Sequence, residues 1–225
     1  AGSEVRVHAY CVMTTHYHLL VKGDLTALSP VMKRFAQSYA QAFNTRYERF
    51  GPLFAGRFHA VAIDGDVQFA TVVRYIALNP TAIDRYDIDS FPWSSHGAMR
   101  SDRTPEWLEP GIVDRVGGPE QYRELVDGGR PNADVIIEMA RMVLDETACG
   151  RGSRRGDVRD VVLLVADVAG GALEHQLVTA LEFETDLASR RARHRARARS
   201  GDPAIELALA RVCDLARINR APPAS

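Results

Sequence analysis

The start of the chain shows an alternation of apolar and polar positions that predicts two β-strands. Apolar side chains occupy every second position over residues 5–13, and a second apolar run covers residues 17–21. A period of two is typical of strands with one buried face. Thr14 and Thr15 separate the two runs, so we predict an antiparallel hairpin that turns at this pair.

A different period follows and predicts a long helix over residues 28–49. Apolar and aromatic side chains recur there at intervals of four, at Val31, Phe35, Tyr39, Phe43 and Tyr47. This spacing places them on one helix face, which we expect to pack into the core. Four basic residues lie off this face, where they are either solvated or in contact with phosphates: Lys33, Arg34, Arg46 and Arg49.

Residues 58–63 alternate again and predict a third strand. A helix is then expected to start at Asp64 to Asp66 and to reach Asn79, because Pro80 stops it. Residues 97–131 are rich in proline, glycine and charge and predict loops with one short helix near residues 121–126.

Helical periodicity without strand signals covers residues 133–144, 157–169, 173–188 and 203–216. We therefore expect three parts along the chain. A first domain would cover residues 4–96, a loop-rich extension and linker residues 97–131, and a helical domain residues 132–220, with DNA binding as one option for the last.

Composition is that of an ordinary globular protein. The net charge is −1, so any nucleic-acid binding would have to come from local basic patches. The three cysteines lie far apart and form no C-x-x-C pair, which argues against a disulfide framework or a cysteine-ligated zinc site. With no apolar run of about 18 residues and no signal peptide, we expect a cytoplasmic protein without a membrane partner.

The candidate chemistry centres on His16 and His18, which share one strand face because they are two residues apart. Two neighbouring imidazoles can chelate one divalent cation, although the same pair also fits a partly hydrated strand without metal. Tyr75 and Asn79 lie four residues apart on one helix face. If that face meets the histidines, the site holds a phenol nucleophile and three metal ligands, which suits attack on a phosphodiester. On spacing alone, Tyr75 also fits a core aromatic.

Eight blocks along the chain carry a resemblance to a known family. The sequence resembles the single-tyrosine HUH transposases, and most closely the REP-associated tyrosine transposases. The blocks occur in the family's order between about residue 4 and about residue 128, at residues 10–13, 16–21, 39–44, 51–54, 56–58, 74–76, 79–80 and 86–95. Two features depart from the family pattern. Thr14-Thr15 stands where the family usually has Pro-Asn, and no strand and helix precede Val5.

The resemblance implies a fold, a reaction and a set of site residues. The fold would be α+β: a ferredoxin-like antiparallel sheet with packed helices, the HUH endonuclease fold without its first strand and helix, followed by an all-helical domain. His16, His18 and Asn79 would bind Mg²⁺ or Mn²⁺, and Tyr75 would be the nucleophile. The reaction would be cleavage and rejoining of single-stranded or hairpin DNA through a 5′-phosphotyrosine.

Basic segments supply the candidate DNA contacts. The resemblance places Arg57 and His59 in a DNA-proximal segment. Residues 189–199 carry no acid and hold six arginines, which are either a solvated helix face or phosphate contacts: Arg190, Arg191, Arg193, Arg195, Arg197 and Arg199. Trp93 is expected to be a packing anchor rather than a base-stacking platform.

Two other functions stay open at this point. The first is a catalytically inactive or truncated relative that binds DNA hairpins without cleavage. The second is a replication initiator or plasmid relaxase of the HUH class, although the Tyr75-Ile-Ala-Leu-Asn79 form favours the transposase branch. The oligomeric state, monomer or homodimer, is left open.

Overall fold

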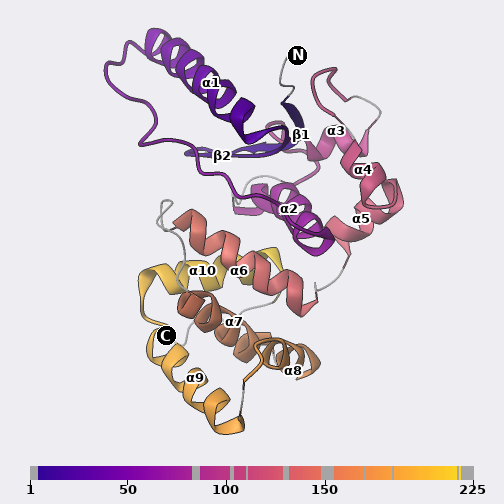
Figure 1. Ribbon diagram of the computed structural model, residues 1–225, viewed down its shortest axis with the longest axis vertical. Coiled ribbons are helices and arrows are strands. Elements are labelled where there is room, and N and C mark those ends of the chain that lie inside the picture. The colour runs from indigo at the N-terminus through magenta and orange to yellow at the C-terminus, as the bar shows by residue number, and fades with distance from the viewer. Residues whose placement is uncertain are drawn as a thin grey trace.

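The computed structural model describes residues 5–82, 87–101, 104–109, 111–128, 132–147, 155–169, 171–183, 185–216 and 218. Tyr86 and the predicted boundary residues 4, 131 and 220 lie outside these ranges. The described chain has a mixed α+β architecture, with a two-stranded antiparallel sheet packed with helices first and a mainly helical region after it (Figure 1).

The predicted hairpin is present. Strand β1 (Arg6–Val12) pairs antiparallel with β2 (Tyr17–Lys22), from Arg6 opposite Lys22 to Val12 opposite Tyr17. The register shifts between Val7 and Ala9, so His8 lies at a bulge. The turn is closed by the Met13 N–H, which donates to the His16 carbonyl over 2.8 Å.

Helices cover both faces of this sheet. Tyr17 and His18 are consecutive in β2 and therefore point to opposite faces. The Tyr17 ring contacts Phe35 of α1 (Leu25–Arg46), whereas the His18 ring contacts Tyr75 of α2 (Asp66–Leu78). The sheet therefore lies between α1 and α2, and the far end of α1 extends away from it (Figure 1).

The outer edge of β1 is covered by segments that come later in the chain. Cys11 forms a bridge with Ser94, and Val7 forms one with Leu108. The Val12 N–H also donates to the Trp93 carbonyl over 2.8 Å. Three short helices belong to this part of the chain: α3 (His96–Arg100), between the two bridging segments, and α4 (Gly111–Arg115) and α5 (Pro119–Asp127), after them. Only α5 was predicted.

Two predictions from the hydrophobic pattern are wrong. Residues 58–63 form no strand, because this segment has no neighbouring strand edge to bond to, and four of its six side chains are exposed. The aromatic face of α1 is not core, since Phe35 is 45% and Tyr39 50% exposed. Trp93, expected as a packing anchor, is 61% exposed.

The remaining chain forms a helical region with helices α6 (Ala133–Thr147), α7 (Arg155–Ala169), α8 (Gly171–Ala180), α9 (Asp186–Ala198) and α10 (Pro203–Leu215). The predicted helix over 173–188 is two helices, because Glu182 takes a left-handed φ of 48° and Thr185 caps the start of α9.

The helical region packs directly against the end of α2. Helix α6 contacts α2, and α10 contacts the 3₁₀ turn η1 (Asn79–Ala82) that follows α2. Buried residues form one cluster from Ala9 in β1 to Ile218 after α10. Among the described residues, no helix is both long and apolar enough to cross a membrane.

Candidate active site

The structure brings the His16 and His18 rings together at the start of β2. Their centroids are 5.0 Å apart and the rings are nearly perpendicular, at 84°. His16 precedes the first residue of the strand, and its Nδ1 lies 3.1 Å from the Thr15 hydroxyl. When Nδ1–H donates to that hydroxyl, the lone pair of the ring is on Nε2, the atom that would meet a metal.

The donor set fits a divalent cation. Two imidazole ligands with metal–nitrogen bonds of about 2.0–2.1 Å have their nitrogens within about 4 Å of each other. Ring centroids 5.0 Å apart allow that approach. Within the described ranges, no group of three His, Cys, Asp or Glu side chains is arranged to hold a metal. The further ligands would therefore be an amide oxygen, water or a substrate phosphate.

Tyr75 lies directly against this pair. Its ring centroid is 5.2 Å from that of His18, and the two rings meet edge to face at 89°. Tyr75 projects from the buried face of α2 and is only 1% exposed. Arg74, the residue before Tyr75 in α2, is also buried. Its guanidinium group donates to the Leu125 carbonyl in α5 and to the Gly128 carbonyl just after this helix, which holds α2 against α5.

Asn79 lies at the end of α2, on the same helix face as Tyr75, but its side chain is hydrogen-bonded to other protein groups. Its Nδ2 donates to the Tyr75 carbonyl over 3.0 Å. Its Oδ1 accepts a hydrogen bond of 2.7 Å from Arg211 Nη2, which also donates to the Asn79 carbonyl over 3.1 Å. Asn79 is 1% exposed. Its amide oxygen would have to exchange Arg211 for a metal ion to act as the third ligand.

Sequence reasoning missed Arg211, which α10 carries to this site across 132 positions of sequence. Arg211 also lies near β1: burial raises the pKa of the Cys11 thiol to about 12, and the positive charge of Arg211 opposes that shift. Cys11 pairs with His18 across the hairpin. No local signal marks Arg211, because a single arginine on an amphipathic helix is ordinarily solvated.

Comparison with known families supplies the remaining observation. Residues 1–79 match the family described as "Transposase IS200 like". This part of the chain is an IS200-like transposase domain. No curated protein and no solved structure matches the chain. The match includes both histidines and Tyr75 and ends at Asn79, so Arg211 lies outside it.

An IS200-like transposase domain belongs to the HUH-type nucleases that act in DNA transposition, and it implies DNA as partner and a divalent metal as cofactor. The predicted DNA contacts Arg57 and His59 are exposed in the irregular segment between α1 and α2. This segment contacts the sheet next to the site histidines, because its Phe54 ring lies 6.2 Å from the ring of Tyr17, between His16 and His18.

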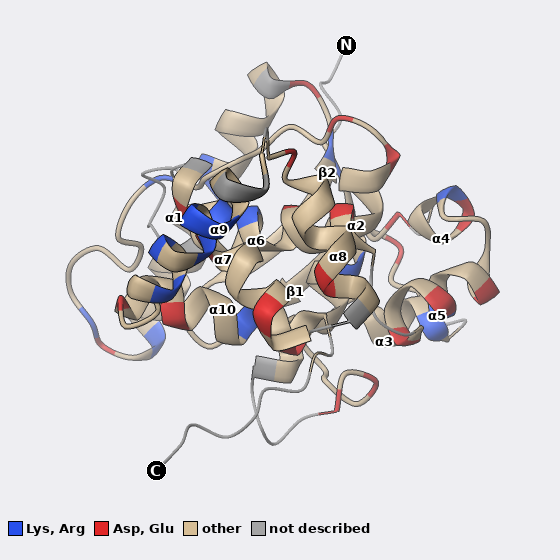
Figure 2. Cartoon of the chain, turned by 90° about the horizontal axis from the view of Figure 1, so that it is seen from below, with Lys and Arg blue, Asp and Glu red and all other residues tan. Residues whose placement is uncertain are grey.

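The arginines of α9 divide into two groups, although Figure 2 shows basic residues gathered along this helix. Ala192 and Ala196 are buried and turn one face of α9 inward. On that side Arg193 pairs with Asp167 and Glu174, at 3.3 and 2.7 Å.

Two further arginines of this run are ion-paired. Arg197 meets Asp167 at 2.7 Å, and Arg199 meets Asp157 at 2.9 Å and Asp160 at 2.5 Å. These carboxylates compete with phosphates for the same guanidinium groups. Arg190, Arg191 and Arg195 are exposed on the outer side of α9. The alanines at 192 and 196, four apart in an arginine run, were the sequence signal for the inner face.

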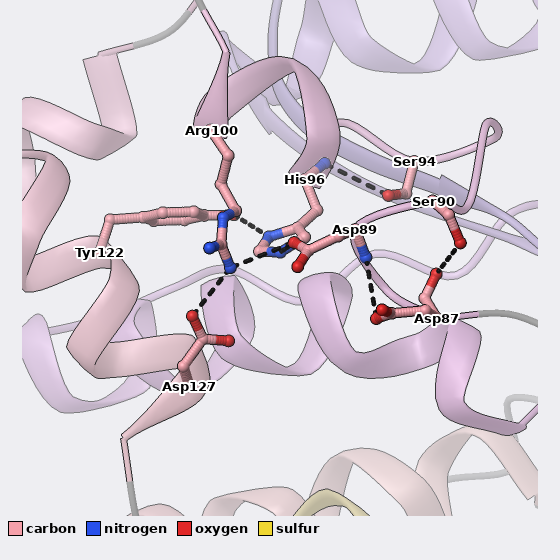
Figure 3. A network of polar contacts seen from close by, with 8 residues as sticks. All are labelled: Asp87, Asp89, Ser90, Ser94, His96, Arg100, Tyr122 and Asp127. Atoms are coloured by element: carbon pink, nitrogen blue, oxygen red, sulfur yellow. Dashed lines mark hydrogen bonds and ion pairs between the residues drawn. The ribbon is translucent and has the colours of Figure 1, made fainter.

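A second polar cluster lies beside the IS200-like domain and was not predicted (Figure 3). His96 Nε2 lies 3.1 Å from Asp89 Oδ1, and His96 Nδ1 lies 2.9 Å from the Tyr122 hydroxyl. Arg100 bridges Asp89 and Asp127, at 3.1 and 2.8 Å. Burial lowers the pKa of His96, and the charge of Asp89 opposes this shift.

A neutral His96 satisfies both neighbours, because Nε2–H donates to Asp89 and the Tyr122 hydroxyl donates to Nδ1. Burial also raises the pKa of Tyr122, which keeps its proton in place. Both ring nitrogens of His96 are thus engaged within the cluster, and the residue is 1% exposed. The cluster holds the segment that supplies Trp93 and Ser94 to the edge of β1 and ties it to α5.

Proposed function

We propose that the protein is a metal-dependent transposase of the REP-associated tyrosine type that cleaves and rejoins single-stranded DNA. One observation carries this proposal: the Tyr75 ring lies 5.2 Å from the ring of His18, which in turn lies 5.0 Å from that of His16. A phenol beside two imidazoles places a nucleophile next to a cation site. The two strands would belong to a ferredoxin-like HUH sheet.

His16 and His18 would hold Mg²⁺ or Mn²⁺, with Asn79 as third ligand once Arg211 releases it. A bound divalent ion would polarise the scissile phosphate and offset the charge that develops there. Each histidine would bind the ion through the lone pair of one ring nitrogen, and Thr15 would fix the His16 ring.

Tyr75 would carry the covalent step. Its hydroxyl oxygen attacks phosphorus and loses its proton, the bond from phosphorus to the 3′ oxygen breaks, and that oxygen takes up a proton. The products are a 5′-phosphotyrosine and a free 3′-OH. Attack by a 3′-OH on the phosphotyrosine then rejoins a strand without ATP, because the covalent link conserves the energy of the phosphodiester bond.

The DNA would be a single strand that forms hairpins, bound by local basic groups because the chain as a whole carries a charge of only −1. Arg57, His59 and the outer arginines of α9 are the candidate contacts. Since Tyr75 is 1% exposed, the DNA would reach it from the exposed turn at Thr14 and Thr15 as the helix and sheet separate.

The second candidate function is a DNA-binding relative that does not cleave. The buried Tyr75 and the engaged Asn79 side chain favour it, because both would have to move before chemistry. Arg57, His59 and the outer arginines of α9 would serve a binder equally well.

The covalent adduct separates the two functions. The full chain is incubated with Mn²⁺ and a labelled library of single-stranded DNA hairpins, and protein–DNA adducts are resolved under denaturing conditions. We expect an adduct with the native protein and with Tyr10→Phe, a matched loss of one hydroxyl on the neighbouring strand, and none with Tyr75→Phe. Hairpin binding without any adduct would establish the binder, and an adduct that survives Tyr75→Phe would refute the nucleophile.

A further inference from the structure

A chain of aromatic rings leads away from the histidine strand along α1. Tyr17 contacts Phe35 and Phe54, with ring centroids 5.6 and 6.2 Å apart. Tyr39 contacts Phe54 and Phe43, both at 6.1 Å, and Phe43 contacts Tyr47 at 4.5 Å. We call these six residues the aromatic track: Tyr17, Phe35, Tyr39, Phe43, Tyr47 and Phe54.

Much of the track faces solvent. Phe35, Tyr39 and Tyr47 are 45%, 50% and 56% exposed, so three of its six members present ring surface outward. The rings of the outer half are tilted to one another by 36° to 43°, so they do not stack face to face on one another. An exposed apolar run of this kind marks a binding surface.

Positive charge surrounds the track. Between residues 25 and 63 the chain holds five basic residues and one acid, Glu48, although the whole protein has a charge of −1. The five are exposed, and none has an ion-pair partner in the part of the chain that the structure describes: Lys33, Arg34, Arg46, Arg49 and Arg57. Arg46 and Arg49 lie over the rings of Tyr47 and Phe43, at 5.8 and 6.0 Å.

We propose that the aromatic track binds single-stranded DNA, with bases stacked on its rings and phosphates held by the flanking cations. Stacking on aromatic side chains inside a basic groove is the general mode of sequence-tolerant single-strand binding. Residues four apart on a helix are separated by about 6 Å along its axis. A stacked strand rises only about 3.4 Å per base. The ring spacing therefore suits an extended single strand better than a duplex.

Charge also argues against a second copy of the chain as the occupant. A two-fold contact would bring the same five exposed cations of both copies together around the rings, with one acid from each copy to offset them. A polyanion is attracted to the same surface.

This inference rests on the proposed single-strand substrate but concerns a different place. Tyr17 and His18 point to opposite sheet faces, so the track lies across the sheet from Tyr75. The track would hold DNA that flanks the cleaved position, and its binding requires neither the metal nor the nucleophile.

The test measures binding of a fluorescent 30-nucleotide oligothymidylate by anisotropy, in EDTA and with Tyr75→Phe protein. We expect Tyr39→Ala and Tyr47→Ala to weaken binding at least about fivefold each, the lower end for a lost base stack. Tyr39→Phe and Tyr47→Phe, which keep the rings, should bind like the parent. Trp107→Ala is the matched control, because Trp107 is 60% exposed but its ring contacts Tyr10 of β1, which is not a member of the aromatic track.

Three outcomes would overturn the proposal: alanine variants that bind like the parent, an equal loss with Trp107→Ala, or a fall from dimer to monomer in sedimentation with DNA binding unchanged. Circular dichroism melting confirms that each variant is folded. The binding assay contains neither the metal nor the nucleophile. Its result therefore does not depend on whether the protein cleaves DNA, and unchanged binding by the alanine variants would not count against the proposed cleavage reaction.

Discussion

Arg211 of α10 donates two hydrogen bonds to Asn79, to its side-chain oxygen over 2.7 Å and to its main-chain oxygen over 3.1 Å. Asn79 in turn donates to the Tyr75 carbonyl over 3.0 Å. The helical region thus reaches the end of the helix that carries Tyr75. The helical region therefore contributes a residue to the candidate site and is more than an attached DNA-binding module.

Removing this arginine should expose the role of Asn79. If Asn79 is the third metal ligand, Arg211→Ala frees its Oδ1 and should tighten Mn²⁺ binding, measured by titration of the free-ion EPR signal. The gain should disappear in Arg211→Ala combined with Asn79→Ala. The variant should also lose about 1.5–3 kcal/mol of unfolding free energy, the usual value of a hydrogen bond to a charged group. Unchanged Mn²⁺ affinity in Arg211→Ala would exclude Asn79 as a ligand.

The role of the histidine pair in metal binding can be tested with His8, a nearby histidine, as the control. His18→Ala should abolish Mn²⁺-dependent DNA cleavage and weaken Mn²⁺ binding, because one of two imidazole ligands is lost. His8→Ala removes an imidazole from the neighbouring strand, at the β1 bulge, and should keep both properties. Loss of Mn²⁺ binding in His8→Ala with retention in His18→Ala would place the metal elsewhere.

Removing two arginines from the outer face of α9 should affect DNA binding, whereas removing two from its inner face should affect stability. Arg191→Gln with Arg195→Gln should flatten the salt dependence of single-strand binding by roughly 0.7 log units per lost phosphate contact and leave stability unchanged. Arg193→Gln with Arg199→Gln should instead lower the unfolding free energy by about 1–3 kcal/mol, because Glu174, Asp157 and Asp160 each lose an ion pair and Asp167 keeps only the one with Arg197. Equal salt slopes in the parent and the outer-face variant would show that this face is merely solvated.

Stability should fall as the pH drops below about 6.5, the ordinary pKa of histidine. Burial lowers the folded-state pKa of His96, so the unfolded chain binds the extra proton first in that window, and protonation favours unfolding. Urea unfolding at pH 7.5 and 5.5 measures the loss, at most about 1.4 kcal/mol per pH unit for one group.

His96→Asn should reduce this pH dependence while lowering stability at both pH values. His8 adds an effect of the same sign, because burial lowers its pKa as well. A His96→Asn variant with the full pH dependence of the parent would assign the effect to other groups.

Local patterns predicted the local structure. The hairpin follows from alternation and from a polar turn at Thr14 and Thr15, and α2 follows from its start near Asp66 and its stop at Pro80. Residues 58–63 show the limit of such patterns. Alternation makes a segment suited to a strand, but a strand also needs a neighbouring edge, which this segment does not have in the described structure.

Residue spacing predicted which side chains of the candidate site share a strand or helix face, and nothing beyond that. Residues two apart in a strand and four apart in a helix share a face, which grouped His16 with His18 and Tyr75 with Asn79. Whether the two groups meet depends on packing between α2 and the sheet. The contact between Arg211 and Asn79 joins residues that are 132 positions apart in the sequence, and no periodicity encodes such a contact.

The most direct measurement is the site of covalent attachment. The protein is reacted with Mn²⁺ and single-stranded hairpin DNA, digested with nuclease and protease, and analysed by tandem mass spectrometry. The account predicts a 5′-phosphate-linked nucleotide on the peptide that contains Tyr75, and no such nucleotide when EDTA is present during the reaction. A nucleotide on any other tyrosine, or strand cleavage with no covalent nucleotide, would contradict it.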